Sequence, residues 1–444
     1  MYCFKHKTRL ALVVSLLASS TCQLAHAESL GEAIAFALKH NPKIEGALIN
    51  QDIADERYKE ERSSLYPELN ASMELSRSFI NSSTTRGLTV DRGEAYTWAL
   101  DGSGSITQTL FDASGRSNRI LAARTDKEVA SKESFKTHHD VKFEAIIAYL
   151  TVMQAREVLD KARDNAQRII GHVEDLRRVY DAGGIDELAL RTSEEGLLEA
   201  RKAVVNFEKE LKNAEAEYVR VIGHKPEGEM NIADINLASI PEQLEEAIAI
   251  AKKRHPSLPI AIGQIASATY SADAERSTLF PTVQSALSYY KKDQDDIVGG
   301  ENIEAKALIR MNWAMSTGGA EKAKIRQAVY EQEMAKAKYK EIEADIVKGV
   351  KNAYYSKENA EVTYKLVEQT VKINAELLKN YENQFKLSKA NRIQIIQAEN
   401  KFFASHIKLI NAQYRQIASN YAVLESIGLL DEAVATAIQG NQAL

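Results

Sequence analysis

The chain has 444 residues, of which 44% are hydrophobic and 27% charged, so it can bury a core and is not intrinsically disordered. Lys and Arg number 57 against 62 Asp and Glu, and the resulting net charge of −5 excludes a strongly basic nucleic-acid-binding protein. The sequence has no uninterrupted apolar run of about 20 residues, which excludes an ordinary transmembrane helix.

Residues 1–27 have the pattern of a secretory signal peptide. Three basic residues precede an apolar run at Leu10–Leu17, and a small-x-small cleavage site closes the segment at Ala25-His26-Ala27. Both cysteines, Cys3 and Cys22, lie inside this segment, so a chain cleaved after Ala27 would contain no disulfide. Such a chain is typical of a bacterial envelope protein rather than of a disulfide-stapled secreted domain.

The rest of the sequence consists of two similar repeats. Residues 30–67 align without a gap on residues 244–281, and 15 of these 38 positions are identical. Further along, the offset changes from 214 to 205 residues and pairs Ala148-Tyr149 with Ala353-Tyr354. We therefore predict a tandem duplication. Its parts are a first repeat at 28–229, a second repeat at 230–430 and a C-terminal tail at 431–444.

Two long tracts without proline, 68–225 and 282–444, permit very long helices. The first tract carries an apolar heptad seam with 4-3 spacing from Val141 to Tyr180, which predicts a coiled-coil-like helix. Helix lengths then predict that each long helix pairs with two shorter helices stacked end to end. The expected helices are 117–182 with 186–222 and 43–66, and 320–387 with 391–427 and 257–279. The helical hairpins would turn near residues 183 and 388, with Asp186 as an N-cap.

Between the helices the apolar period changes from 3.5 to 2. Apolar and polar residues alternate over about 68–111 and again over about 282–316, which predicts two β-hairpins whose strands are long enough to cross a membrane. Polar linkers at Asn81–Arg92 and Lys291–Glu301 would join the strands. We expect four aromatic side chains to face the membrane: Tyr96, Trp98, Tyr289 and Trp313.

Four strands cannot close a barrel by themselves, and an open sheet edge is not tolerated in lipid. If these strands meet lipid, several chains must share one barrel, and the polar face must line its interior. The long helices carry too many charges to enter a bilayer and must project into water. We expect a mainly α-helical protein with a shared barrel standing on a helical tube.

Several motifs together resemble the TolC family of outer-membrane channel proteins. They are the Leu-x-Glu-Ala helix start, the repeated Pro67 and Pro281 before a hairpin, the segment Leu110–Gly115 that opens a long helix, and Ile222-Gly223 at the end of the repeat. The resemblance implies a homotrimer in the bacterial outer membrane, with a 12-stranded β-barrel and a 12-helix periplasmic α-barrel. It also implies docking to a periplasmic adaptor and to an inner-membrane ABC or RND pump, for type I protein secretion or drug efflux.

The resemblance also assigns roles to the helix tips. Where such channels often carry constriction-lining aspartates, this chain has Gln394 and Gln397, while Asp186 and Glu187 could supply negative charge nearby. A neutral amide ring would attract cations less than a carboxylate ring. Adaptor docking is expected on the tip turns, at Gly183, Gly184, Ser388 and Lys389.

Other readings of the sequence are weaker. Adjacent His138 and His139 point apart on a helix and suit a solvated face better than a metal site. The acidic group Asp293–Asp296 lacks the ligand spacing of a calcium loop. No catalytic motif occurs, so neither an enzyme nor a cofactor is expected. A soluble periplasmic coiled-coil adaptor, and a structural protein without channel activity, remain as alternatives, and the cargo stays open.

Overall fold

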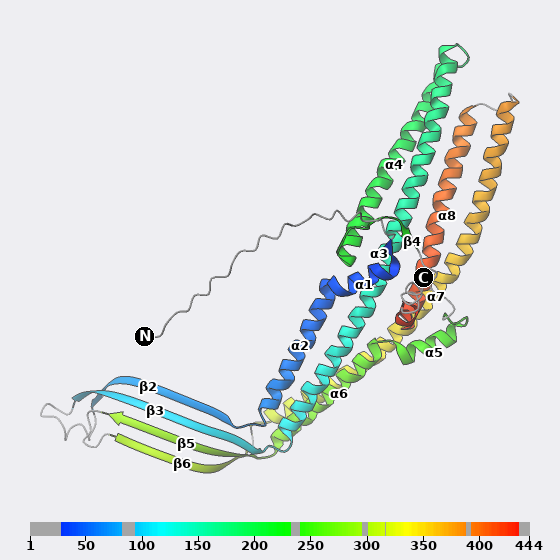
Figure 1. The fold of residues 1–444 in the computed structure, drawn as a ribbon. Coiled ribbons are helices and arrows are strands. Elements are labelled where there is room, and N and C mark those ends of the chain that lie inside the picture. The colour runs from blue at the N-terminus through cyan, green and yellow to red at the C-terminus, as the bar shows by residue number, and fades with distance from the viewer. Residues whose placement is uncertain are drawn as a thin grey trace, which may run out of the picture.

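The computed structural model describes residues 28–81, 94–231, 240–294, 301–315, 317–387 and 392–434. A long stalk of helices carries a four-stranded sheet at one end and two helical tips at the other (Figure 1). The expected signal peptide lies outside these residues, as do Ser388, Lys389 and most of the expected tail.

The sheet is formed by β2 (Glu68–Asn81), β3 (Glu94–Phe111), β5 (Thr282–Gln294) and β6 (Glu301–Asn312). Its order is β2-β3-β5-β6 and all neighbours are antiparallel, so the two predicted hairpins pair side by side. The second linker was predicted too long, because Lys291–Gln294 continue β5 and Glu301 already pairs with Asp293. Charged side chains at these positions suggested a loop, but the exposed end of a strand accepts them equally well.

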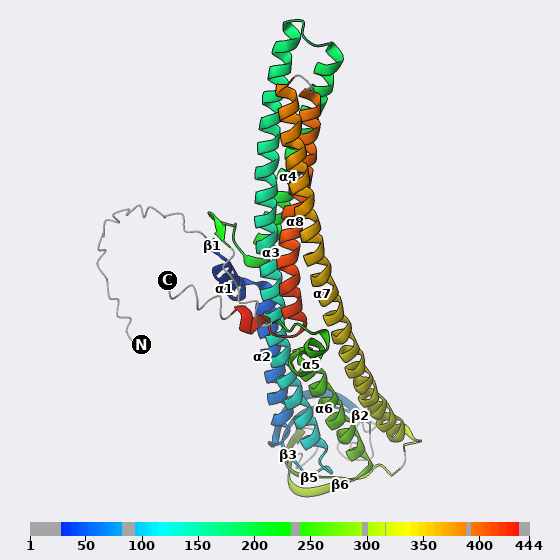
Figure 2. The same cartoon turned by 90° about the vertical axis from the view of Figure 1, so that its right-hand side faces the viewer.

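The six long helices confirm the pairing expected from length. In the first half, α3 (Gly115–Asp181) packs along α4 (Glu187–Ile222) and α2 (Pro42–Ser63). In the second half, α7 (Ala320–Lys386) packs along α8 (Arg392–Ser426) and α6 (Ser257–Arg276). Because α3 also contacts α6 and α8, the helices form one layer in which α7 lies at one edge and α2 with α4 at the other (Figure 1). Figure 2 shows α7 running beside α8 along the stalk.

Short elements cover one side of this layer around its middle. They include α1 (Leu30–His40), α5 (Leu244–Arg254) and a two-stranded parallel sheet of β1 (Glu28–Ser29) with β4 (Met230–Asn231), while η3 (Ser277–Leu279) ends α6. The buried Tyr149 hydroxyl donates toward the carbonyls of Glu28 and Asn231, at 2.7 and 2.9 Å. This bond anchors the two-stranded sheet on α3.

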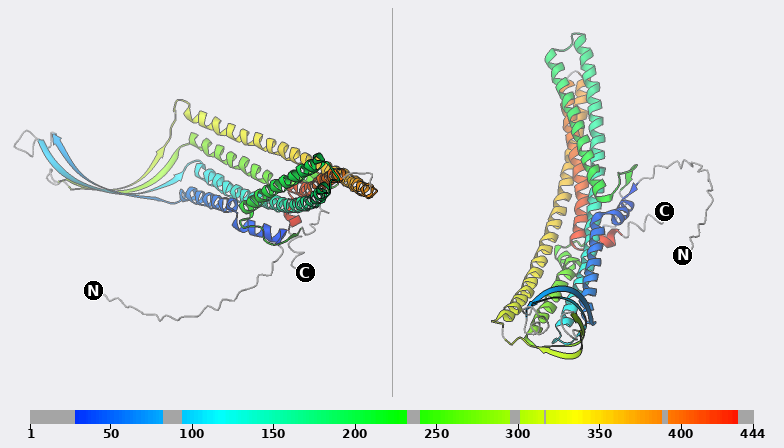
Figure 3. Two further views of the ribbon diagram at one scale, coloured as in Figure 1. Left: turned by 90° about the horizontal axis from the view of Figure 1, so that it is seen from above. Right: turned by 90° about the vertical axis from the view of Figure 1, so that its left-hand side faces the viewer.

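The heptad seam of α3 is the core of the stalk. Ten of its twelve predicted positions are buried, and the exceptions are the half-buried Ala155 and the exposed Tyr180 near the tip. In α7 fewer seam positions are buried, because this helix lies at the edge and has neighbours on one side (Figure 3). The seam therefore describes packing within one half, while much of α7 remains uncovered in a single chain.

Candidate functional site: the sheet face, the helix tips and the stalk

The sheet has one apolar and one polar face. Cross-strand neighbours Leu69, Ile106, Leu287 and Ala307 lie in one row, and the next row along the strands joins Asn70, Ser105, Ser288 and Lys306 on the other face. Side chains alternate between faces along a strand, so this register makes each face chemically uniform over much of its length. Such a sheet can separate lipid from water.

The aromatic residues lie at different places along the apolar face. Tyr96, Trp98 and Tyr289 are exposed on the strands, and the Arg77 guanidinium lies over the rings of Tyr96 and Trp98 at 5.7 and 5.3 Å. Trp313 was expected within a strand, but it follows the last residue of β6. Its indole nitrogen donates to the carbonyl of Leu279 at 3.2 Å, which ties the end of the hairpin to the base of α6.

The first helical hairpin ends in a turn that glycine permits. Gly183 has a φ of +76°, a left-handed conformation that other residues adopt at a cost. Asp186 caps α4 by accepting the Ala189 amide at 3.0 Å, as the sequence predicted. Glu187 forms an ion pair with Arg191 at 3.3 Å, so part of the acidic charge expected here is already neutralised within the tip.

The second hairpin presents two glutamines. Near the start of α8, Ile395 is buried against α7 and Ile396 against α3 and α4, while Gln394 and Gln397 are exposed on the side of α8 away from both contacts. Both amides therefore project from the stalk close to its tip, a position compatible with a pore lining.

A polar cluster that the sequence analysis missed joins the two hairpins just behind the tips. Arg392 of α8 pairs with Asp175 of α3, and His172 Nε2 lies 3.2 Å from a carboxylate oxygen of the buried Glu399. Desolvation acts to raise the pKa of Asp175, but the Arg392 and Arg178 guanidinium groups overcome it and lower that pKa. The partners are separated by 217 residues in sequence, and no local pattern could have paired them.

A second polar cluster attaches the segment after α8 to α3. Asp431 lies 2.5 Å from the Lys142 ammonium and 3.7 Å from the Nδ1 of the buried His139. The ion pair with His139, together with Lys142, outweighs burial and lowers the pKa of Asp431 to about 2. Burial acts to lower the pKa of His139, but the Asp431 carboxylate reverses this and raises it. His139, expected on a solvated face, is thus a buried partner of a carboxylate.

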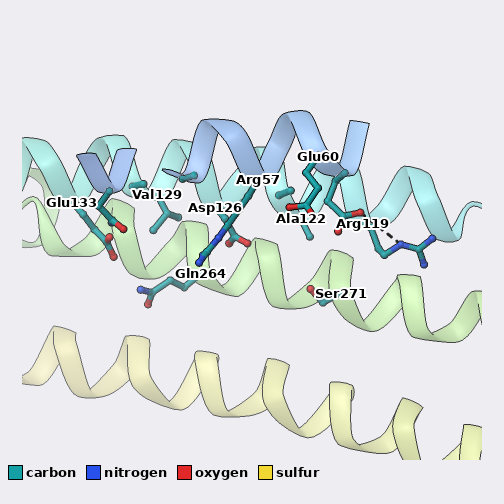
Figure 4. Close-up of a pocket in the computed structure, with 14 residues that line it drawn as sticks. Arg57, Glu60, Arg119, Ala122, Asp126, Val129, Glu133, Gln264 and Ser271 are labelled. Carbon is teal, nitrogen blue, oxygen red and sulfur yellow. Dashed lines mark ion pairs between the residues drawn. The ribbon is translucent and has the colours of Figure 1, made fainter. Parts of the chain in front are cut away.

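A charged groove of about 570 Å³ lies between α2, α3 and α6 (Figure 4). Arg57 of α2 and Asp126 of α3 extend into it, and Arg119 pairs with Glu61 beside it at 3.9 Å. Its lining mixes both signs of charge. In the part of the chain that is described, no three His, Cys, Asp or Glu residues cluster as metal ligands would, and none of the helices is long and apolar enough to cross a bilayer.

An amphipathic sheet on a long stalk of paired helices, built from two repeats, is the architecture of outer-membrane channel proteins. The model of the outer membrane efflux protein family matches residues 33–224 and 247–429, once for each repeat, and the chain belongs to this family. It lies in the outer membrane, with a long helical part in the periplasm.

Individual relatives agree with this assignment. The outer membrane efflux protein BepC of Brucella suis is 23% identical over 434 residues, which cover 96% of this chain and 91% of that protein. The outer membrane protein TolC of Escherichia coli is 21% identical and covers 96% of this chain and 87% of its own length. The crystal structure of the Campylobacter jejuni CmeC outer membrane channel superposes with a TM-score of 0.76 at 12% identity, covering 93% of this chain and 88% of that one.

Proposed function

We propose that three copies of this chain form a passive exit duct through the outer membrane, fed by a periplasmic adaptor and an inner-membrane pump. The observation that carries the proposal is that a single chain leaves its sheet open. β2 and β6 are the end strands in the sheet order, so their outer edges have no partner among the described residues. Three chains of four strands would supply the 12 strands of a closed barrel, in which no edge meets lipid.

The helical layer is open in the same way. Along α7, large apolar side chains repeat at heptad spacing on the side opposite its buried seam, and each is 45–59% exposed: Tyr355, Val362, Leu366, Ile373 and Leu377. At the opposite edge α4 exposes Leu188, Leu198 and Val205, and α2 exposes Leu48, Ile49 and Ile53. A second apolar seam on a coiled-coil helix requires a partner helix.

The two edges also differ in charge. Acidic residues outnumber basic ones six to four in α2 and eight to six in α4, whereas α7 has thirteen basic and eleven acidic residues. Unlike edges, formed by helices whose net charges are small and opposite in sign, favour head-to-tail contact between copies, which generates a closed ring when the rotation between neighbours closes. This supports ring assembly over a soluble monomeric adaptor.

The duct itself would hydrolyse nothing, and energy would come from the pump. An adaptor would bind the tip turns near Gly183 and Ser388. If it binds the open state more tightly than the closed state, its binding shifts the equilibrium toward the open state by that difference in affinity. Gln394 and Gln397 would line the constriction. The duct would serve type I protein secretion or drug efflux.

The proposal is tested by planar-bilayer conductance of the detergent-purified protein, with its mass measured in the same sample. A trimer with small, long-lived and steady conductance is the expected result. A water-soluble monomer without conductance would overturn the barrel and restore the coiled-coil adaptor as the better explanation.

A further inference from the structure

The helical layer has a covered and an open face, and two equivalent tyrosines mark the covered one. Tyr149 of α3 bonds to the small parallel sheet, and Tyr354 of α7, its counterpart in the second repeat, donates to the carbonyl of Pro241. Residues two positions away on a helix point about 200° from these tyrosines. Ile147 and Thr151 on α3 therefore face the open side, and the same holds for Asn352 and Ser356 on α7.

Two cavities on this open face meet at Arg415 of α8. One, of about 750 Å³, lies between α3, α7 and α8 and includes Ile147, Asn352 and Ser356 in its lining. The other, of about 320 Å³, lies between α3 and α8 and includes Ile147 and Thr151. Arg415 lines both, so its exposed guanidinium lies on the face opposite the covering elements.

Basic residues continue from Arg415 along the same side of α8. Lys408 and Lys401 precede Arg415 by one and two heptads, and Gln394 precedes it by three, so the four side chains form one column toward the tip. All four are exposed. The spacing along the helix is about 10 Å between successive members.

These cations have no ion-pair partner in the part of the chain that the structure describes. Among the described residues, no ion pair or side-chain hydrogen bond involves Lys401, Lys408 or Arg415. The two carboxylates of α8 lie elsewhere, since Glu399 is buried against His172 and Glu425 is largely buried beside His139.

The helix α3 carries a similar column of polar and basic side chains at heptad spacing. Gln154 of α3 lines the smaller cavity, and Lys161 and Arg168 follow it at one and two heptads on the same side. Successive charges about 10 Å apart are close to one Debye length at physiological salt, so their fields overlap along the wall. Glu157 of α3, which bonds to Tyr414 beside the smaller cavity, is a carboxylate near this column, so the wall carries an excess of positive charge rather than one sign alone. An excess of one sign of charge on a low-dielectric wall concentrates the opposite ion.

We propose that Lys401, Lys408 and Arg415 form a positively charged ladder on the inner wall of the helical tube, and that this ladder makes the channel favour anionic solutes. This rests on the proposed duct, since only a closed tube turns the open face into a lumen. Three copies would place nine unpaired cations around the path. The cavity beside Arg415, which also contains Phe143 and Tyr355, would suit an anion that carries an apolar group.

The test is the reversal potential of the purified channel in a planar bilayer under a KCl gradient. The wild type should be more permeable to chloride than to potassium. The triple variant Lys401→Gln, Lys408→Gln, Arg415→Gln should lower that ratio at least about threefold. The control is Lys39→Gln, Lys225→Gln, Lys253→Gln, which removes three exposed cations from the covering side and should leave the ratio unchanged.

The outcomes separate this proposal from the duct itself. Channels that conduct but prefer potassium, or whose ion preference is equal in the two triple variants, would refute the ladder and leave the duct standing. A preparation without any channel would refute the duct, and the assignment of a lumenal wall with it. Trimeric mass of the triple variant in detergent shows that any change in selectivity does not come from lost assembly.

Discussion

At the scale of single residues, buried charge is concentrated where the chain must hold distant segments together. The adjacent histidines His138 and His139 were predicted to lie on a solvated helix face. His139 is instead only 3% exposed and faces Asp431 of the segment after α8. Burying an imidazole is unfavourable for its charged form, and a nearby carboxylate compensates for that cost. The pair therefore serves to attach the C-terminal segment to α3.

We expect Asp431→Asn to lower the free energy of unfolding by about 1–3 kcal/mol near neutral pH, because it leaves His139 and Lys142 without their carboxylate. The lowered pKa of Asp431 contributes stability above its ordinary value of 3.8, which is lost as the pH falls toward 2. The raised pKa of His139 contributes stability below 6.5, which is lost as the pH rises through the higher folded-state value.

Thermal unfolding of the detergent-solubilised wild type and variant between pH 5 and 9 measures both effects. The gap in melting temperature should be widest on the acidic side of neutrality and should narrow as His139 loses its proton. Lys142→Gln, which leaves the His139 contact in place, is the control and should keep most of that pH dependence. A gap that does not change with pH would show that the His139–Asp431 contact contributes nothing.

The exposed glutamines near the tip, Gln394 and Gln397, would determine the charge of the pore constriction. If Gln394 and Gln397 line the constriction, Gln394→Asp and Gln397→Asp should each shift selectivity toward cations and introduce block by multivalent cations, since a trimer gains a ring of three carboxylates. Gln413→Asp is the matched control, because Gln413 is exposed on α8 but lies two residues from Arg415 and thus on another side. Unchanged reversal potentials in both tip variants would remove these residues from the pore.

At the scale of elements, the cluster behind the tips decides how firmly the two hairpins hold each other. Arg392 and Asp175 belong to different hairpins, and Leu176, Leu190 and Ile396 form a small apolar contact beside them. A change in the angle between the hairpins must therefore break the Arg392–Asp175 pair or carry it along.

Arg392→Ala should loosen the closed tip and raise the steady conductance of single channels. Loss of a partly exposed ion pair costs about 1 kcal/mol, which changes an open-to-closed ratio about fivefold. Arg177→Ala is the control, because Arg177 pairs with Glu194 inside the first hairpin and does not bridge the two. Equal conductance in the two variants, or no change in either, would show that the inter-hairpin pair does not restrain the tip.

The elements themselves were largely readable from the sequence, because their signals are periodic and local. Heptads, alternating strands and the absence of proline gave six helices and two hairpins with ends correct to within a few residues. The two-residue strands β1 and β4 were not predicted, since a pair this short has no period and forms only when Tyr149 brings the segments together. Both polar clusters likewise depend on contacts between residues far apart in sequence.

At the scale of the whole molecule, the single chain is incomplete in two ways that agree. Among the described residues, β2 and β6 each leave one edge of the sheet without a partner, and the helical layer ends in exposed apolar side chains on α7 and on α2 with α4. Closing the sheet and covering these side chains require the same lateral contact between copies. The family model matches the chain twice, so each copy would contribute two similar units to such a ring.

Closure of the ring would depend on the exposed apolar side chains of α7. Leu366 is 59% exposed in the free seam of α7, and Leu366→Glu together with Ile373→Glu should place charges in the contact between copies and prevent stable trimers. The control Asn383→Glu adds a negative charge at an exposed position of the same helix that lies about 80–100° around the axis from Leu366 and Ile373, and it should assemble normally. Mass in detergent and heat-stable migration on gels measure the oligomer, while circular dichroism shows whether the helices still form. Trimers of normal stability in the double variant would mean that α7 does not form the contact, and the apolar seam would then need a different partner.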